Sequence, residues 1–253
     1  MKSHKGGIFT GDFMKETACL FDLDGVVLNT EHQYSKFWGE ICREYLGDWQ
    51  ICLKIKGNTL GFIMDNFFGG IKDKHDEILA KLKSFEEEMS LEYIPGAREF
   101  LEELKLKGIK TCIVTSSNAK KMEFVCKKHA EFNELFNFIL TEEDFSKSKP
   151  DPEPYLLAAE KCGCKPENCL VFEDSFNGLK SGRSAGCKVI GLATTNSRQS
   201  IIELADLTAD DFTELDFEIL QEMVGIPPKI DGLEGFLPPA QDSKIPADNF
   251  YYK

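Results

Sequence analysis

The chain has 253 residues, of which 42% are hydrophobic and 29% are charged, and this length suits one large domain or a domain with an insertion. Its formal net charge of -13 argues against a general affinity for nucleic acid or for an anionic membrane. No stretch resembles a membrane span or a signal peptide. A soluble, cytoplasmic protein is therefore expected.

The N-terminal part begins with residues 1–16, which are glycine-rich, polar and without periodicity, and this predicts disorder. The apolar run 18–21 then predicts a buried strand that ends in Asp22-Leu23-Asp24-Gly25-Val26. Ligand sites in open α/β sheets lie beyond such strand ends. One carboxylate can act as a nucleophile and the other as a proton donor and acceptor, with a divalent metal relieving their repulsion. An acidic turn that caps a helix is the alternative.

The pattern becomes helical from residue 30 to about residue 93. Apolar residues recur three to four positions apart, as at Phe37, Trp38, Ile41 and Tyr45, and no convincing strand interrupts the block. This pattern predicts a small helical domain inserted after the first strand.

Helices and strands alternate after Pro95-Gly96. Strands are predicted at 109–114, 138–141, 169–172 and 188–192, and helices at 121–129, 155–162 and 178–185. Such alternation predicts an α/β fold with a parallel sheet that is covered on both faces. From about residue 219 onward, five prolines predict an extended C-terminal segment.

The nine cysteines are scattered through predicted strands and helices. We interpret them as buried small hydrophobic residues rather than as a disulfide framework. Cys162, Cys164 and Cys169 lie close together, but they lack the paired spacing of a structural zinc site.

Two further loops carry groups suited to binding a phosphate. Thr115 and Ser116 follow the strand at 109–114 and precede a helix, where a hydroxyl and free amides can hold a phosphate oxygen. An ordinary helix cap is the alternative. Lys149 lies in a loop stiffened by Pro150 and Pro152, and it could balance the charge of a carboxylate and a phosphoryl group. Taken in isolation, a solvated loop lysine is the simpler interpretation.

A second pair of acids, Glu173 and Asp174, ends the strand at 169–172 and suits Mg²⁺ coordination. In the helix that follows, Gly178 and Gly182 lie on one face and allow a close approach to the sheet.

Together, the four motifs resemble those of the haloacid dehalogenase superfamily, in order and approximate spacing, over residues 18 to about 215. The resemblance points to the subgroup that includes β-phosphoglucomutase and many sugar-phosphate phosphatases. It implies a Rossmann-like core formed by residues 17–29 and 94–218, with a helical cap formed by residues 30–93. Residues 219–253 would form a proline-rich extension.

The resemblance also implies roles for the motif residues. Asp22 would be the nucleophile that forms an aspartyl-phosphate, and Asp24 would be the general acid and base. Thr115 and Ser116 would hold the phosphoryl oxygens, and Lys149 would balance the charge. The ligands of Mg²⁺ would be Asp22, the carbonyl oxygen of Asp24 and Asp174, with Glu173 assisting.

The cap departs from the pattern of the mutases in two places. Tyr34 stands where they carry a histidine, and Lys56-Gly57-Asn58-Thr59-Leu60 lacks the arginine that grips the distal phosphate of the substrate. Lys56 could bind an anion, but only as a point charge. Tyr34, Lys56 and Asn58 are therefore our candidates for substrate contacts in the cap.

We predict a Mg²⁺-dependent phosphatase that acts on a small phosphorylated metabolite of the sugar-phosphate type. A β-phosphoglucomutase-like phosphohexomutase is the second interpretation, and a catalytically silent binding protein is the third. Dehalogenases of the superfamily lack the second aspartate, which is present here as Asp24. The expected partner is the metabolite alone, without nucleic acid or membrane, and the expected state is a monomer. The sequence does not identify the substrate.

Overall fold

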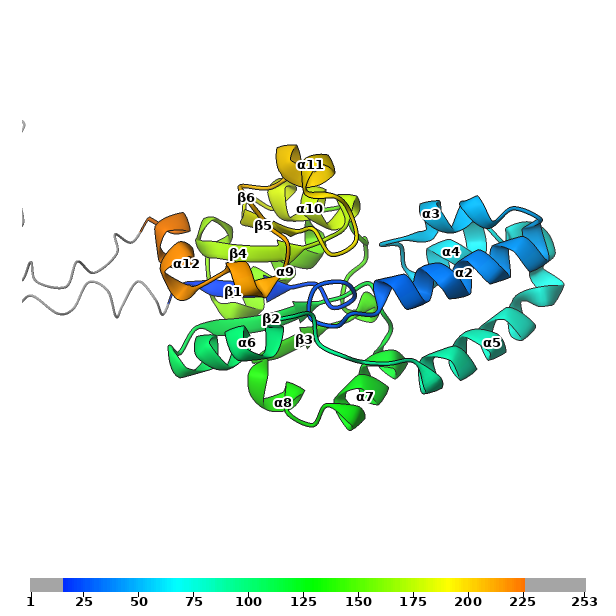
Figure 1. Ribbon diagram of the computed structural model, residues 1–253, viewed down its shortest axis with the longest axis horizontal. Coiled ribbons are helices and arrows are strands. Elements are labelled where there is room, and N and C mark those ends of the chain that lie inside the picture. Colours follow the sequence, from blue (N-terminus) through cyan, green and yellow to red (C-terminus); the bar gives the residue numbers. More distant parts are fainter. Residues whose placement is uncertain (1–15, 226–253) are drawn as a thin grey trace, which may run out of the picture.

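Six strands form one parallel sheet in the computed structural model, which describes residues 16–225 (Figure 1). The strand order is β3-β2-β1-β4-β5-β6, so the first strand lies near the middle of the sheet. The strands are β1 (Ala18–Phe21), β2 (Lys110–Val114), β3 (Phe138–Leu140), β4 (Cys169–Glu173), β5 (Lys188–Leu192) and β6 (Leu207–Ala209). Because all pairs are parallel, the carboxyl ends of the strands lie along one edge of the sheet.

Helices cover both faces of the sheet, as expected when every strand is apolar on both sides. One face packs against α6 (Ala97–Leu106), α7 (Ala119–Lys128), α8 (Phe132–Leu135) and α12 (Phe217–Met223). The other face packs against α9 (Glu153–Cys162), α10 (Phe176–Ser184) and α11 (Arg198–Ile201). Within β1, Cys19 and Phe21 belong to the first layer, and Ala18 and Leu20 to the second.

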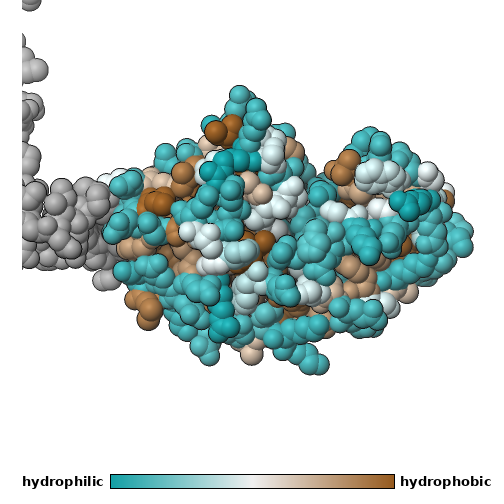
Figure 2. Space-filling model, viewed as in Figure 1, coloured by the Kyte–Doolittle hydropathy of each residue, from teal (hydrophilic) through white to brown (hydrophobic). Residues whose placement is uncertain are grey.

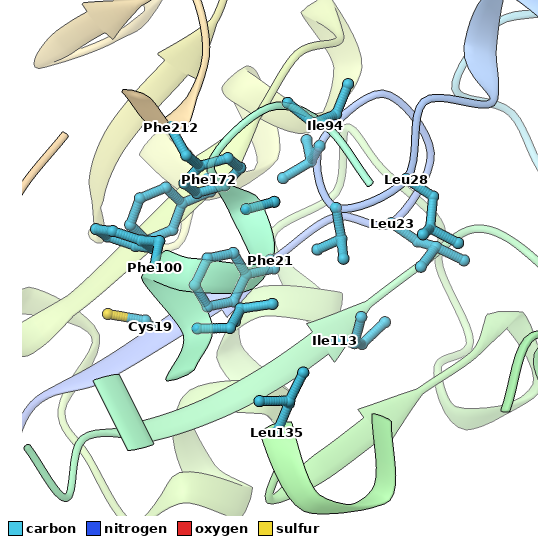
Figure 3. Packing of buried hydrophobic residues seen from close by; sticks show 14 of the residues in the cluster. Cys19, Phe21, Leu23, Leu28, Ile94, Phe100, Ile113, Leu135, Phe172 and Phe212 are labelled. Carbon is cyan, nitrogen blue, oxygen red and sulfur yellow. The ribbon is translucent and has the colours of Figure 1, made fainter. Parts of the chain in front are cut away.

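A group of phenylalanines packs within the first layer, and Figure 3 labels Phe21, Phe100, Phe172 and Phe212. The rings of Phe21 and Phe172, from neighbouring strands, stack with their centroids 4.5 Å apart. Phe100 of α6 meets Phe172 edge-on at 5.6 Å, and Phe212 closes the group. A buried phenylalanine contributes about 1.5–3 kcal/mol to stability. This cluster therefore holds the two central strands, which carry the acidic residues, in fixed register.

A helical lobe follows β1 and lies at the end of the molecule opposite α12 (Figure 1). It consists of α2 (Glu31–Leu46), α3 (Cys52–Ile55), α4 (Leu60–Asn66) and α5 (His75–Glu88), with short 3-10 turns between them. Trp38, Phe68, Ile78 and other buried residues give the lobe its own core. We call this lobe the cap and the sheet with its helices the core. Residues 31–88 contain no strand, as the helical periodicity predicted.

The predicted α/β fold with a parallel sheet is confirmed. The strands at 18–21 and 188–192 have the predicted bounds, whereas α7, α9 and α10 each begin two residues earlier than predicted. The close approach of α10 is also confirmed, because a Cβ on Gly182 would lie 3.0 Å from a methyl group of Val171.

Two elements near the end of the described chain differ from the predictions. The three-residue β6 was not predicted, because Leu207-Thr208-Ala209 is too short for an apolar run. Helix α12 crosses residue 219, where the extension was expected to begin, and its buried Leu220 packs on the core. The predictions for residues 1–15 and 226–253 lie outside the described residues.

Eight of the nine cysteines are buried and Cys126 is half-buried, which confirms their predicted role as small core residues. All nine are free thiols. Across residues 16–225 we find no helix with the length and apolar character needed to span a membrane.

Candidate active site

The predicted motif residues meet at the carboxyl edge of the sheet. Backbone pairing continues past the strand ends, with Asp22 N donating to Phe172 O at 3.1 Å and Thr115 N donating to Leu140 O at 3.0 Å. Asp22, Thr115 and the Glu173-Asp174 pair therefore lie side by side, although about 150 residues separate the first from the last. A cavity of about 560 Å³ opens above them between core and cap, where Figure 2 shows a recess between the two lobes.

Lys149 is the cation at the centre of the site, and its side chain is only 2% exposed. Its Nζ donates to Asp22 Oδ1 at 2.7 Å, to Glu173 Oε1 at 2.6 Å and to Val114 O at 2.8 Å. Burial lowers the pKa of Lys149, but the charges of Asp22 and Glu173 outweigh burial and raise it above its ordinary value. The ammonium group therefore stays charged beside the Asp22 carboxylate.

Asp22 points into the cavity with one oxygen held by Lys149. Burial raises the pKa of Asp22 to about 7, with Lys149 lowering it and the Glu173 charge raising it further. A positive charge on the other side of Asp22 would favour its ionised form. The neighbouring acids show where that charge would bind.

Glu173 is fully buried, and its hydrogen bonds involve both oxygens. Oε1 accepts from Lys149 and from Tyr155 OH at 2.7 Å, and Oε2 accepts from the backbone amide of Asp174 at 3.2 Å and from Ser175. The helix behind it must come close, since a Cβ on Gly178 would lie 1.8 Å from Glu173 Oε1. Glu173 is thus placed to orient Lys149.

Asp174 supports the presence of a metal most directly. Its Oδ1 is buried and has no hydrogen-bond partner among the described residues. Burial, followed by the charges of Glu173 and Asp22, raises the pKa of Asp174 well above its ordinary value. Oxygens of Asp22, Glu173 and Asp174 lie within 4.8 Å of one another. A small divalent cation with oxygen ligands fits this donor set, and Asp22 and Asp174 have the freer oxygens.

Asp24 is held by three donors rather than left free. Lys121 Nζ donates to its two oxygens at 2.6 and 2.5 Å, and Ser117 Oγ donates at 3.0 Å. Thr30 Oγ1 donates to Oδ1 at 2.5 Å. Burial raises the pKa of Asp24, but the charge and hydrogen bonds of Lys121 outweigh burial, so the net pKa is lowered. Asp24 is therefore a carboxylate in this arrangement.

The sequence analysis did not single out Lys121, whose side chain is 4% exposed. Its Nζ also lies 4.4 Å from the centre of the Tyr34 ring, so it joins the core to the cap. The sequence did offer one indication that Lys121 is buried. Lys121 and the buried Val125 lie four residues apart, and so on the same face of α7.

Thr115 and Ser116 lie where the phosphate seat was predicted, with different orientations. Thr115 is buried, and its hydroxyl accepts from the amide of Ser117 at 3.0 Å, so it shapes the loop. The Ser116 hydroxyl lines the cavity and has no partner within the described part of the chain. Asn118 caps the ten-residue helix α7 beside them. Of the two hydroxyls, that of Ser116 is the one free to meet a phosphate oxygen.

The three cap residues all line the cavity, but each already has a partner. Tyr34 OH donates to Glu86 Oε1 at 2.8 Å, and Lys56 Nζ lies 3.6 Å from Glu31 Oε1. Asn58 Nδ2 donates to the backbone oxygens of Lys54 and Ile55, which end α3. The Asn58 side chain therefore stabilises the loop that follows α3. The Tyr34 hydroxyl and the Lys56 ammonium group border the cavity, and each is paired with a glutamate.

Comparison with known proteins identifies the family. The haloacid dehalogenase-like hydrolases match residues 19–192, which is more than half of the chain. The chain belongs to the haloacid dehalogenase-like hydrolases. A bifunctional riboflavin kinase/FMN phosphatase of Arabidopsis thaliana is 30% identical to this hydrolase over 237 residues, which cover 88% of this chain and 60% of that protein. The chain thus spans less than two thirds of that relative.

Other relatives match almost end to end. A probable pseudouridine-5'-phosphatase of Drosophila melanogaster is 29% identical, covering 78% of this hydrolase and 94% of its own chain. Among solved structures, a HAD hydrolase of Entamoeba histolytica superposes with a TM-score of 0.71 at 24% identity, covering 82% of this chain and 99% of its own. A β-phosphoglucomutase of Clostridium difficile gives a TM-score of 0.68 at 23% identity, with coverages of 82% and 96%.

The two solved structures share the fold of this hydrolase, and the pseudouridine-5'-phosphatase relative is 29% identical to it in sequence. The predicted family is confirmed by the family match, and the class of phosphomonoester hydrolase by the phosphatase relatives. The phosphoglucomutase-like subgroup stays a prediction. The roles of the individual site residues stay predictions.

Proposed function

We propose that this hydrolase is a Mg²⁺-dependent phosphatase that cleaves a small phosphorylated metabolite of the sugar-phosphate type through an aspartyl-phosphate. The observation that carries the proposal is the environment of Asp22. One of its oxygens is fixed by the buried Lys149, and the unpartnered groups of Ser116 and Asp174 border the same cavity. The names of the relatives, which include an FMN phosphatase and a pseudouridine-5'-phosphatase, support a phosphorylated metabolite as the substrate.

In the first half of the reaction, a carboxylate oxygen of Asp22 attacks the phosphorus, and the ester bond to the alcohol oxygen breaks. Lys149 balances the charge that builds up between carboxylate and phosphoryl group, and the Ser116 hydroxyl donates to a phosphoryl oxygen. When bound at Asp22 and Asp174, Mg²⁺ would supply the positive charge that offsets the repulsion between carboxylate and phosphate.

Asp24 transfers a proton in both halves of the reaction. In the first, Asp24 exchanges its bonds to Lys121 for one to the substrate, takes up a proton from solvent, and passes that proton to the leaving alcohol oxygen. In the second, its carboxylate takes a proton from the water that attacks the aspartyl-phosphate, and phosphate and free Asp22 are released. The lowered pKa of Asp24 suits the second step, because the carboxylate is the form that accepts the proton.

A β-phosphoglucomutase-like phosphohexomutase would need a strong grip on a second phosphate. Among the described residues that line the cavity, the cations are Lys54, Lys56, Lys121 and Lys149, and there is no arginine. Without an arginine to bind a second phosphate, these residues favour hydrolysis of the aspartyl-phosphate over transfer of its phosphoryl group back to the sugar.

The test measures phosphate release and isomer formation in the same reactions, with p-nitrophenyl phosphate, β-glucose 1-phosphate and glucose 6-phosphate as substrates. We expect phosphate release that needs Mg²⁺ and is abolished by a chelator. Conversion of β-glucose 1-phosphate to glucose 6-phosphate faster than phosphate release would establish the mutase instead. No turnover of any of these esters would favour the silent binding protein.

A further inference from the structure

The cap lines its side of the cavity with apolar residues as well as charged ones. The cap contributes Trp38 from α2, Ile55 from α3, Ile63 from α4 and Leu82 from α5, and each of these side chains is at most 6% exposed overall. We call these four residues, together with Leu60 at the rim, the apolar wall. Because the phosphate must lie at the core end, the apolar wall faces the alcohol part of the substrate.

The charged groups of the cap half would repel a second anion. Glu31 and Glu86 both line the cavity, and Lys56 is already paired with Glu31 at 3.6 Å. Lys121 is committed to Asp24, and Lys149 to Asp22 and Glu173. Of the four lysines that line the cavity, only the exposed Lys54 has no carboxylate partner within residues 16–225, and it lies outside the apolar wall.

The two carboxyl groups can serve an uncharged ligand. Burial raises the pKa of Glu31 to about 7, with Lys56 opposing the shift, and burial also raises the pKa of Glu86. A carboxyl group in that state can accept from a hydroxyl or N–H group, or donate to a carbonyl oxygen. Neither exchange requires a charged substrate.

The size of the cavity sets the last constraint. Its volume of about 560 Å³ lies within the range of about 300–1,000 Å³ that is typical of pockets for drug-sized ligands. A three-carbon or five-carbon alcohol would fill only a small part of this volume.

We infer that the cavity selects phosphomonoesters whose uncharged sugar or alcohol carries a further ring with an apolar surface and a few hydrogen-bonding groups, as in a nucleoside 5'-monophosphate, and that it discriminates against bisphosphates. The inference deepens the proposed function and rests on it. It adds the chemical class of the leaving group, which is set by the apolar wall and by Glu31 and Glu86.

Matched ligands separate the two parts of the inference. Uridine 5'-monophosphate and ribose 5-phosphate share the phosphate and the sugar, and only the former carries the uracil ring. Uridine 5'-monophosphate and uridine 3',5'-bisphosphate differ in the second phosphate. We expect at least a tenfold preference for uridine 5'-monophosphate in each comparison. The readouts are kcat/KM for phosphate release by the wild type and Kd by calorimetry on Asp22→Asn with Mg²⁺.

Two tryptophans of the cap provide matched variants. Trp38→Leu shortens the apolar wall and should reduce the preference over ribose 5-phosphate to less than threefold. Trp49→Leu is the control, because Trp49 is 47% exposed and does not belong to the described cavity lining, and it should keep the preference. Since Trp38 also packs in the cap core, Leu60→Arg at the half-buried rim is the second variant. It should improve binding of the bisphosphate at least tenfold relative to the monophosphate.

The inference is overturned if ribose 5-phosphate matches uridine 5'-monophosphate in both readouts, or if the bisphosphate binds more tightly to the unmodified cap. Loss of the preference in Trp49→Leu as well would also overturn it. The proposed function fails separately, if p-nitrophenyl phosphate and all three ligands are left uncleaved with Mg²⁺ present. In that case the Kd values on Asp22→Asn still decide which leaving group the cavity prefers.

Discussion

Replacing Glu173 by glutamine should destabilise the protein far more than its similar shape suggests. The carboxylate is fully buried and accepts hydrogen bonds on both oxygens, from Lys149 and Tyr155 on one side and from Asp174 N and Ser175 on the other. A glutamine has one acceptor and one donor end. In either orientation its amide group would face donors, and Lys149 would lose one of its two carboxylate partners.

The expected size of the effect follows from this arrangement. Breaking a buried ion pair by removing one charge costs about 3–5 kcal/mol, because the remaining charge is left uncompensated. In a domain of roughly 150–250 residues, each kcal/mol lowers the melting temperature by about 2–4 °C. We therefore expect Glu173→Gln to melt roughly 6–20 °C below the wild type in a thermal scan followed by circular dichroism.

The control is Glu102→Gln, which removes a carboxylate paired with Arg98 where both side chains are 52% exposed. Solvent screens that pair, so the change should stay within about 0.5 kcal/mol of the wild type. A loss of less than about 1 kcal/mol in Glu173→Gln would show that Lys149 does not depend on Glu173, and the reasoning would be refuted.

Three further outcomes are expected. Asp22→Asn should reduce turnover of p-nitrophenyl phosphate to background with an unchanged circular dichroism spectrum, and more than a few per cent of activity would exclude Asp22 as the nucleophile. Fluoroberyllate with Mg²⁺ should raise the melting temperature of the wild type but not of Asp174→Ala, and equal shifts would reject Asp174 as a ligand. Gly178→Ala should lower the melting temperature, because its Cβ would collide with Glu173, whereas Gly61→Ala, with no described neighbour within 4 Å, should not.

The sequence predicted the position of the site because parallel strands place their carboxyl ends together. Asp22, Thr115 and Asp174 each follow an apolar run, and the structure brings them to one edge of the sheet. The partners of these residues were harder to predict. The contact of Lys121 with Asp24 spans 97 residues and depends on the packing of α7, while its neighbour Lys120 makes the segment read as a solvated helix face.

A short strand and a local side-chain contact were also missed by the sequence analysis. In β6, strand formation depends on pairing with β5 rather than on its own pattern, because three residues cannot show a period. The cap loop was predicted to contact substrate through Asn58, but the spacing alone could not show that its amide group binds the end of α3. A tertiary contact determines the first case, whereas in the second the hydrogen bonds are local, from Asn58 to residues three and four positions earlier.

The burial of the thiols has a practical consequence. A thiol shielded from solvent does not react until the surrounding structure opens, and eight of the nine are shielded in this way. A maleimide should modify the half-buried Cys126 first and the remaining eight only at the rate at which the protein unfolds. Cys42 and Cys52 report on the cap, and the others report on the core. Mass spectrometry of labelled peptides can therefore measure the opening rates of the two lobes separately, without any engineered probe.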